Sequence, residues 1–393
     1  MVQAIDLERV RRETPGVGRS VHLLACGSAL MPQPVVDAVV NHTRLEAEIG
    51  GYEAHARESE ALDRVYDVCA AHIGASPREI ALLENATVAW CHAFYSLPLK
   101  PGSRILTCEA EYAANYVALL QRARRDGLTI EVVPSDAAGP LDLTALEAMI
   151  DGDVGLIAMT WIPTNGGLVN PAAEVGAIAR RYGVPYLLDA CQAAGQMPVD
   201  VETLGCDFLS ATGRKFLRGP RGTGFLYVRE KWLETLEPAM IDHFGAPWIA
   251  REEYALRDDA RRFETWENSY ALRAGLGAAF GYAESIGIDA IQDRVRHLAD
   301  HCRDLLGGLD RVQVRDLGHE RCGIVSFSVE SGDARGIVER MAEAGCAIGA
   351  SDPASTRIDA ERRGLPDLVR IAPHYYNTDE EIERAVEALS GLI

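Results

Sequence analysis

The sequence predicts an α/β protein, with a large domain on a mostly parallel sheet and a smaller α+β C-terminal domain. Between residues 103 and 228, continuous apolar runs alternate with helical segments, which is typical of a parallel sheet covered by helices on both faces. After about residue 282 the alternation ends, and a length of 393 residues favours two domains. We expect the large domain at residues 17–282 and the small domain at residues 1–16 and 283–393.

Apolar runs of strand length locate the strands of the large domain. Runs such as VGLIAM and YLLDA are apolar throughout, as expected of strands that are buried on both faces. The first expected strand continues into the turn that follows it. The expected strands lie at residues 103–112, 128–134, 154–162, 184–190, 206–212 and 222–228.

Apolar residues at helical spacing predict the helices of the large domain. They lie at residues 34–50, 58–75, 113–127, 142–150 and 170–183, and the third carries basic residues near its end. In the small domain we expect a long helix after residue 282, a strand at 322–329, a helix at 334–345 and a last helix. That last helix begins in NTDEE, where Thr378 and Glu381 have the spacing of a capping box.

Composition excludes several classes of protein. The formal net charge of −19 argues against nucleic-acid or anionic-membrane surfaces, which need clustered cations. No apolar run reaches 18 residues, and the start MVQAIDLERVRRETPG lacks the apolar core of a signal peptide. Nine scattered cysteines without metal-ligand spacing indicate reduced thiols, so we expect a cytoplasmic protein without a metal site.

Lysine is rare in this chain, which has Lys100, Lys215 and Lys231 beside 36 arginines. Unlike arginine, lysine can lose its proton and attack a carbonyl group as a free amine. Lys215 follows the expected strand 206–212 and precedes a run rich in Gly and Pro. This position makes Lys215 a candidate for covalent chemistry.

Polar groups follow several of the expected strands, where open α/β sheets bind their ligands. Asp189 ends one strand, Lys215 follows another, and the turn TWIPTNGG follows a third. The segment LLENATVAWCHAF offers the backbone amides of a turn that opens a helix, which suit a phosphate group. A lysine, a carboxylate and a phosphate site together are what pyridoxal 5'-phosphate needs.

Five segments also occur in the order found in a known family. They are ENATVAW, TWIPTNGGLVNP, YLLDACQAAGQMPVDVETLGCDF, SATGRK and VRIAPHYYNTDEE. In this order the chain resembles the class V aminotransferases, the fold-type I group of pyridoxal-phosphate enzymes that includes the cysteine desulfurases. The resemblance covers nearly the whole chain. It implies a seven-stranded type of sheet and a homodimer with its sites at the subunit interface, with FETWENSY contributing to the neighbour's phosphate pocket.

The resemblance implies a role for each candidate residue. Lys215 would form the Schiff base with the cofactor, Asp189 would pair with the pyridine nitrogen, and Gln192 would reach the phenolic oxygen. Thr164 or Asn165 would contact the ring oxygen or the substrate, with the spacing favouring Thr164. Four residues would hold the phosphate: Ala86, Thr87, Thr212 and Arg214. Arg370 would bind the α-carboxylate of an amino-acid substrate.

Two departures separate the chain from the desulfurase pattern. Desulfurases carry a nucleophilic cysteine on the loop before the carboxylate-binding arginine, but residues 349–368 contain none. Cys346, just before that loop, is expected at the start of a strand and in the core. Where desulfurases have a stacking histidine, this chain has Ala113, so we expect Tyr112 beside it to stack on the ring. Persulfide chemistry is therefore disfavoured.

Three functions remain after these comparisons of motifs. IPTNGG and FETWENSY resemble the epimerase-like and C–S lyase branch, which includes lyases of the ergothioneine pathway and of lincosamide biosynthesis. This favours a C–S lyase that performs β-elimination on an S-substituted cysteine. Transamination, epimerisation or decarboxylating oxidative deamination of a similar amino acid is the second function, and a non-catalytic binding protein is the third. A nicotinamide enzyme is disfavoured because no G-x-G-x-x-G follows the first strand.

Five of the candidate residues could instead have a purely structural role. Lys215 could lie on the surface, Asp189 could cap a following helix, and Arg370 could form a salt bridge at a strand end. Gln192 and Thr164 could be incidental to the site.

Two further segments suggest chemistry that we do not expect. The neighbours Cys91 and His92 point apart on a helix, so we expect them to serve packing. The glycine-rich GPRGTG lacks the lysine and Ser/Thr of a P-loop and is expected to form a tight turn between strands.

Overall fold

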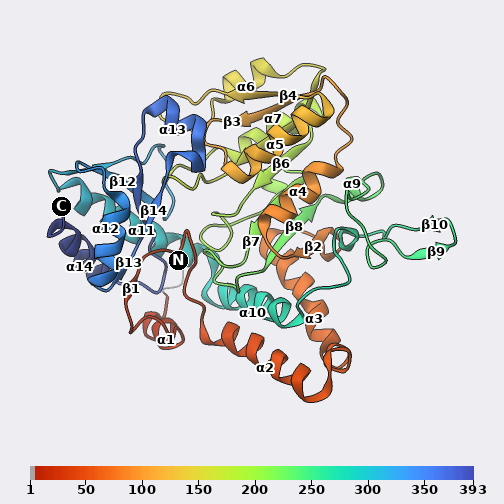
Figure 1. Ribbon diagram of the computed structural model, residues 1–393, viewed down its shortest axis with the longest axis horizontal. Helices are drawn as coiled ribbons and strands as arrows, with labels where there is room; N and C mark the ends of the chain where they lie inside the picture. The colour runs from red at the N-terminus through yellow and green to blue at the C-terminus, as the bar shows by residue number, and fades with distance from the viewer. Residues whose placement is uncertain (1–4) are drawn as a thin grey trace.

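The computed structural model describes residues 5–393 and contains a seven-stranded sheet with the order β2-β8-β7-β6-β5-β3-β4 (Figure 1). Only β8 runs antiparallel to its two neighbours, β2 and β7, and the other pairs are parallel. The strands are β2 (Ile80–Leu83), β3 (Arg104–Cys108), β4 (Thr129–Val133), β5 (Val154–Thr160), β6 (Tyr186–Asp189), β7 (Phe208–Thr212) and β8 (Gly224–Val228).

The six strands located in the sequence are confirmed, and the seventh was not located. β2 is only four residues long, IALL, and is fully buried between a 3-10 turn and the next helix. A run this short has no periodicity that separates a strand from a loop. Its pairing with β8 sets the edge of the sheet next to the predicted phosphate site.

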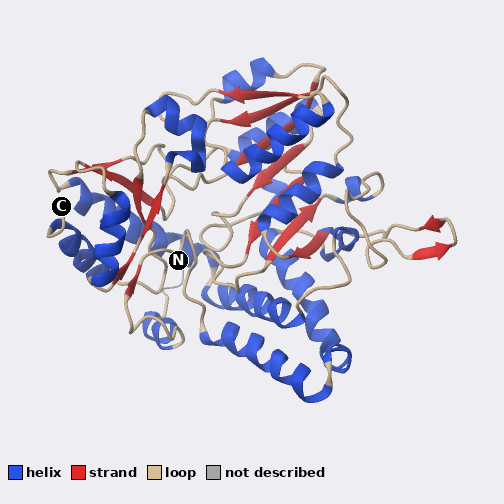
Figure 2. Ribbon diagram, viewed as in Figure 1, coloured by secondary structure: helices blue, strands red, loops and turns tan. Residues whose placement is uncertain are grey.

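Helices cover both faces of the large sheet (Figure 2). The helices of this part of the chain are α2 (Gln33–Ile49), α3 (Gly51–Ile73), α4 (Ala86–Ser96), α5 (Ala113–Asp126), α6 (Leu143–Met149), α7 (Ala172–Tyr182), α8 (Val201–Leu204), α9 (Glu230–Leu233) and α10 (Tyr270–Ile286). Alternate strand residues face opposite layers: Leu187 packs in the cluster with α4 and α5, while Leu188 packs in the cluster with α3, α7 and α10. The continuous apolar runs thus reflect burial on both faces.

One helix begins earlier than predicted. α3 starts at Gly51 rather than at residue 58, because Gly50, with φ of +96°, turns the chain sharply between α2 and α3. The intervening segment is largely exposed and carries little apolar periodicity. The hairpin of β9 (Trp248–Ala250) and β10 (Glu253–Tyr254) projects from the molecule on the side opposite the C-terminal elements (Figure 1).

The C-terminal elements pack around a second sheet, with the order β11-β12-β15-β14 and antiparallel pairing throughout. They are α11 (Ile288–Gly307), β11 (Val312–Val314), β12 (Val325–Val329), α12 (Ala334–Glu343), β13 (Cys346–Ala347), β14 (Gly349–Ser351), α13 (Arg357–Arg363), β15 (Leu368–Ile371) and α14 (Asp379–Ser390). The predicted capping box of Thr378 and Glu381 is confirmed at α14.

The N-terminal segment joins the same region. It contains α1 (Leu7–Arg12) and β1 (Val21–His22), which pairs in parallel with β13. The division into residues 17–282 and the two flanking segments stays a prediction, and residues 1–4 lie outside the described chain. Across residues 5–393, no helix has the length and apolarity needed to cross a membrane.

Candidate active site

Two cavities meet at Lys215 on the rim where the parallel strands end. The α4 cavity has a volume of about 440 Å³ and surrounds the start of α4, reaching from Glu84 to Asp189. The Arg370 cavity has a volume of about 240 Å³ and extends towards Arg370 and Asp352. Tyr112, Arg214 and Lys215 line both cavities, so these three residues form the junction.

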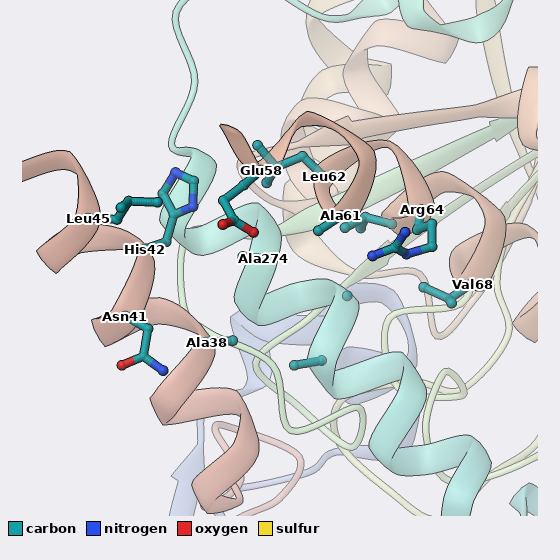
Figure 3. Close-up of a pocket in the computed structure, with 13 residues that line it drawn as sticks. Ala38, Asn41, His42, Leu45, Glu58, Ala61, Leu62, Arg64, Val68 and Ala274 are labelled. Carbon is teal, nitrogen blue, oxygen red and sulfur yellow. The ribbon is translucent and has the colours of Figure 1, made fainter. Parts of the chain in front are cut away.

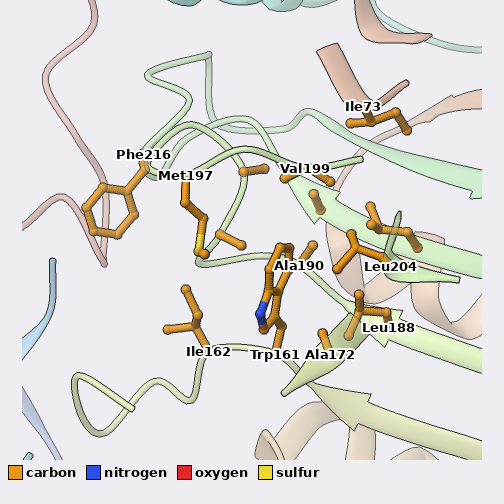
Figure 4. Close-up of a cluster of buried hydrophobic side chains, with 14 of the residues drawn as sticks. Ile73, Trp161, Ile162, Ala172, Leu188, Ala190, Met197, Val199, Leu204 and Phe216 are labelled. Carbon is orange, nitrogen blue, oxygen red and sulfur yellow. The ribbon is translucent and has the colours of Figure 1, made fainter. Parts of the chain in front are cut away.

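Lys215 differs from the other two lysines in its surroundings. Its exposed fraction is only 8 %, whereas Lys100 is exposed and Lys231 forms a surface ion pair with Asp207 at 2.6 Å. The next residue, Phe216, is buried among the core side chains shown in Figure 4 and anchors the loop. Lys215 is therefore not a surface lysine.

Arg218 also fixes the loop that carries Lys215. Its amide donates to the Lys215 carbonyl at 2.9 Å, and its backbone is left-handed with φ of 62°. The buried guanidinium lies 4.9 Å and 4.7 Å from the ring centres of Tyr375 and Tyr376. Its Nη2 donates to Thr14 Oγ1 at 2.7 Å. The cation–π contacts tie the lysine loop to the C-terminal region and hold a backbone conformation that arginine rarely adopts.

Asp189 ends β6 and lines the α4 cavity with 5 % of its surface exposed. Its Oδ1 accepts from the Cys191 amide at 2.9 Å, and its Oδ2 accepts from Asn115 Nδ2 at 2.8 Å. A turn follows it, and the next helix begins only at Val201. Asp189 therefore does not cap a helix, and its carboxylate faces a cavity that holds the Lys215 side chain.

The start of α4 is arranged as an anion site. Ala86 and Thr87 are the first two residues of this 11-residue helix, and the Asn85 side chain accepts from the Val88 amide at 3.0 Å. Ala86 and Thr87 line the α4 cavity, and the unbonded amides and the dipole of a helix start favour an anion there. Thr212 lines the same cavity, and its hydroxyl donates to the Thr223 carbonyl at 3.1 Å.

Two arginines give this cavity a positive wall. Arg214 donates from Nη1 to the Gly27 carbonyl and lies close to Arg221, which also lines the cavity. Burial, and then the charge of Arg221, lowers the pKa of Arg214 below its usual range. An anion between these guanidinium groups would relieve that repulsion.

Arg370 projects from β15 into the smaller cavity. Its Nη1 donates to the Thr164 carbonyl and hydroxyl oxygens at 2.9 Å and 2.8 Å, while its buried Nε has no partner among the described residues. These partners are neutral oxygens and not the carboxylate of a strand-end salt bridge. Positive charge thus remains available to a ligand carboxylate.

Thr164 and Asn165, which the sequence left as alternatives, are used differently. Thr164 lines the Arg370 cavity, while Asn165 lines neither cavity. The Asn165 amide donates to Thr356 Oγ1 at 2.9 Å and accepts from the Ser351 hydroxyl. Asn165 thereby ties the turn after β5 to the wall of the Arg370 cavity.

Tyr112 borders the junction of the cavities, whereas Gln192 lines neither cavity. Tyr112 precedes α5 and lines both cavities, whereas Ala113 lines neither. Burial is the main reason that the pKa of Tyr112 lies above its usual range. Gln192 donates to the Cys26 carbonyl at 3.2 Å, and its buried Oε1 has no partner among the described residues.

Sequence reasoning missed several residues of the site. Asn115 and Arg221 line the α4 cavity, Cys191 lies beside Asp189, and Cys26 and Arg335 line the Arg370 cavity. For Asn115 the sequence held a signal, because Glu111 lies four residues before it and directly after a strand end. Cys191 and Arg221 lie two and six residues after Asp189 and Lys215, whereas Cys26 and Arg335 come from segments that only the fold brings to the site.

Cys346 and His92, which we expected to serve packing, lie in packed surroundings. Cys346 is 2 % exposed and starts β13, in the core of the C-terminal region. His92 packs edge-on against Phe263 with ring centres 6.1 Å apart, and burial lowers its pKa. The segment 219–224 lies at the end of the connection from β7 to β8, as expected, but this connection spans residues 213–223 and is not a tight turn. Arg221 and Gly222 of this segment also line the α4 cavity, so the segment is not purely structural.

A third hollow, of about 450 Å³, lies between α2, α3 and α10 (Figure 3). Its wall combines apolar helix surface with His42, Glu58 and Arg64. It contains none of the predicted site residues, and it lies away from the ends of the parallel strands. The chemistry is therefore assigned to the two cavities that meet at Lys215.

Comparison with known proteins agrees with this geometry. Residues 21–385 match the family model for aminotransferase class-V. The chain belongs to this family. It is an enzyme, and its cofactor is pyridoxal 5'-phosphate. The cysteine desulfurase of Serratia proteamaculans is 31 % identical over 99 % of this chain and 98 % of its own length.

Solved structures share the fold over nearly the whole chain. The apo structure of a cysteine desulfurase from Thermococcus onnurineus NA1 superposes with a TM-score of 0.92 and 26 % identity, covering 99 % of this chain and 98 % of that one. A complex of the cystine C–S lyase C-DES with cysteine persulfide gives a TM-score of 0.86 at 23 % identity, covering 96 % and 99 %. The second likeness is one of fold alone.

The residues present fit the cofactor. The α4 cavity combines a buried lysine, a carboxylate held by two donors, and the free amides of a helix start beside two arginines. Gln192, which donates to the carbonyl of the cavity-lining Cys26, has a buried Oε1 without a partner within residues 5–393. A buried polar atom without a partner is costly unless a ligand or water approaches it.

Proposed function

We propose that this protein is a pyridoxal-phosphate C–S lyase that cleaves an S-substituted cysteine to a thiol, pyruvate and ammonia. One observation carries the proposal beyond the family assignment. The segment before Arg370 contributes Ala350, Ser351, Asp352 and Ser355 to the wall of the Arg370 cavity, and it contains no thiol. Without an acceptor in that segment, sulfur leaves with the substituent instead of being passed to the protein.

Most of the residues that would hold the cofactor line the α4 cavity or its junction, whereas Thr164 lines only the Arg370 cavity and Gln192 and Asn165 line neither. Lys215 would form the covalent link, and Asp189 would accept a hydrogen bond from the ring nitrogen. The phosphate would lie against Ala86, Thr87, Thr212 and Arg214. Tyr112 would cover the ring, and Gln192 and Thr164 or Asn165 would border it. When bound, pyridoxal phosphate supplies an aldehyde that links to amines and a ring that draws electrons from the α-carbon.

Arg370 and Lys215 act on the substrate from two sides of the junction. A bidentate pair between Arg370 and the α-carboxylate fixes the direction of the Cα–H bond. The Lys215 amine, once released from its covalent link, is the nearest base and takes the α-proton at Nζ. The Cβ–S bond then breaks and the sulfur leaves as a thiolate. One water balances the products: thiol, pyruvate and ammonium.

The far end of the Arg370 cavity suits a polar sulfur substituent. Arg335 and Asp352 lie there with Ser351 and Ser355, and the Arg335 guanidinium is 4.0 Å from the Asp352 carboxylate. A substituent that carries both a carboxylate and an ammonium group would satisfy both charges. This supports an assignment to the C–S lyase branch of the family.

A homodimer in the cytoplasm is part of the same proposal. Trp248 and Ile249 on the projecting hairpin, and Trp266 within FETWENSY, are 75 %, 61 % and 45 % exposed. Large apolar side chains exposed in this way support contact with a second copy. The nine cysteines, all unpaired, support a reducing compartment. Sedimentation of the pure enzyme measures the state directly, and a monomer at micromolar concentration contradicts the dimer.

Cysteine desulfurase is the second candidate. It is favoured by the names of the relatives and by Cys26, whose buried side chain belongs to the wall of the Arg370 cavity. In this reaction a cysteine thiolate accepts the substrate sulfur as a persulfide, and the amino acid leaves as alanine. Four further alternatives are transamination, epimerisation, decarboxylating oxidative deamination and a purely binding role. No contact among the described residues of the site specifically supports any of them.

Product analysis separates these functions. The enzyme is incubated with cystine, a cysteine S-conjugate or cysteine, with no added keto acid. A lyase releases pyruvate in proportion to sulfur. Alanine with enzyme-bound persulfide supports desulfuration, carbon dioxide or an aldehyde supports decarboxylation, and a requirement for a keto acid supports transamination. Racemised substrate supports epimerisation. If none of the three substrates is turned over, a binding role is supported.

A further inference from the structure

We propose that Asn115 and Glu111 are positioning residues that fix the orientation and charge of Asp189, and thereby keep the ring nitrogen of the bound cofactor protonated. The proposal rests on the cofactor assignment and does not depend on which substrate is cleaved. Neither residue was predicted to belong to the site.

The Asn115 amide bridges two carboxylates. It lies in the first turn of α5 with 2 % of its surface exposed. Its Nδ2 donates to Asp189 Oδ2 at 2.8 Å and to Glu111 Oε1 at 2.9 Å. The amide has two N–H groups, and both are used on carboxylate oxygens. A flipped amide would direct its oxygen at both carboxylates, so the orientation of Asn115 is determined by its partners.

Glu111 is the fixed end of this bridge. It is 3 % exposed and accepts from the Thr160 amide at 3.0 Å, the Tyr112 amide at 3.0 Å and Thr107 Oγ1 at 3.1 Å. The Thr160 hydroxyl donates to it as well. Burial raises the pKa of Glu111, and the donors from Thr160 and Asn115 oppose that rise. Among the described residues, every bond to Glu111 comes from a neutral donor.

Asp189 is held in the same way from two directions. The Cys191 amide donates to one of its oxygens and Asn115 to the other. A donor on each oxygen prevents the carboxylate from rotating. The negative charge of two carboxylates bridged by one amide also makes the proton of a nearby ring nitrogen harder to remove.

A purely structural role is the competing explanation. Glu111 joins the turn after β3 to the end of β5 and to α5. On this explanation, loss of Glu111 simply weakens the contacts between these elements. The two explanations differ in what they predict for the ring. Loss of a structural tie lowers stability everywhere, whereas loss of a positioning residue changes the protonation of the ring nitrogen.

The test uses two variants and one matched control. Asn115→Leu keeps the side-chain size and removes both donors, and Glu111→Gln keeps the shape and removes the charge. Asn377→Leu is the control. Asn377 is also buried at 2 % and donates to a glutamate, Glu381, at 2.8 Å, but it lies before α14 and lines neither cavity.

The first readout is the ¹⁵N shift of ring-labelled pyridoxal phosphate bound to each apoenzyme. The second is the ratio of affinities for pyridoxal phosphate and its 1-deaza analogue, in which carbon replaces the ring nitrogen. We expect a protonated nitrogen and a clear preference for pyridoxal phosphate in the wild type and the control. In Asn115→Leu and Glu111→Gln, the preference should fall about tenfold or more, and the nitrogen should lose its proton at lower pH.

An unchanged shift and an unchanged affinity ratio in both variants overturn the proposal, whatever their stability. If Asn115→Leu does not fold, Glu111→Gln decides the question alone. Neither readout involves a substrate, so failure of the C–S lyase assignment leaves these results unaffected.

Discussion

The two cavities that meet at Lys215 are built in different ways. The wall of the α4 cavity includes Asp189, Asn115 and Thr212, which are 5 %, 2 % and 5 % exposed and stand at the ends of strands or the start of a helix. The wall of the Arg370 cavity includes the segment 350–355 and Arg335, whose side chain is 74 % exposed. Rigid elements hold the groups needed for cofactor chemistry and also Arg370, which stands on β15, whereas the proposed substituent end of the Arg370 cavity includes the exposed Arg335.

The largest effect is expected on the rigid side. Asp189→Asn should bind cofactor but lose about 3–5 kcal/mol of transition-state stabilisation, or roughly two to four orders of magnitude in kcat. Asp207→Asn is the matched control, since Asp207 is buried at 4 % and accepts from the Tyr186 amide at 3.0 Å outside both cavities. A rate for Asp189→Asn within tenfold of wild type contradicts the role of Asp189.

On the other side of Lys215, Arg370→Gln should lower kcat/KM roughly a hundredfold. This corresponds to a loss of about 3 kcal/mol of transition-state stabilisation, because the substrate carboxylate loses its charged partner. Arg335→Gln should have a smaller effect, which depends on the sulfur substituent. Steady-state kinetics with two substrates that differ only in that substituent separates the two arginines. Equal losses for both arginines on both substrates would remove the distinction between an α-carboxylate site and a substituent site.

Most of the fold was predictable because its signals are local. Continuous apolar runs located six strands, and DxxQ with SxTGxK located Asp189 and Lys215. Cys26 and Arg335 could not be found in this way, because they reach the site only through contacts between distant segments. Cys191 and Arg221 lie two and six residues after Asp189 and Lys215, but no motif marks them as site residues. Asn165 shows the same limit, since the sequence cannot tell that its amide is bonded to Thr356 and Ser351.

A titration far from both cavities should affect the fold and not the site. His72 on α3 packs against Phe280 with ring centres 5.2 Å apart, and burial lowers its pKa from 6.5 to about 4. Between pH 6.5 and about 4, His72 is therefore protonated in the unfolded chain but neutral in the folded chain. The free energy of unfolding should fall as pH drops through this window, by at most about 3 kcal/mol from this group.

Urea unfolding of wild type and His72→Gln on both sides of that window measures the His72 contribution. The wild type should lose more stability on acidification than the variant. Parallel losses would show that His72 is not held in its neutral form by the fold.

The smallest effect concerns the thiols. Cys346→Ser should cost about 1–2 kcal/mol of stability, because it places a hydroxyl in an apolar core, and it should leave the rate unchanged. Cys26→Ser, at the wall of the Arg370 cavity, should also retain lyase turnover. Loss of all activity in a well-folded Cys26→Ser or Cys346→Ser protein favours the desulfurase reaction over elimination.

The central claim is that the two cavities act together through the amine of Lys215, and covalent trapping tests it most directly. The holoenzyme is reduced with borohydride, digested, and mapped by mass spectrometry, beside Lys215→Ala, Lys100→Ala and Lys231→Ala. We expect the cofactor adduct on Lys215 in the wild type, its absence from Lys215→Ala, and its retention in the other two variants. An adduct that survives the loss of Lys215 would contradict the account.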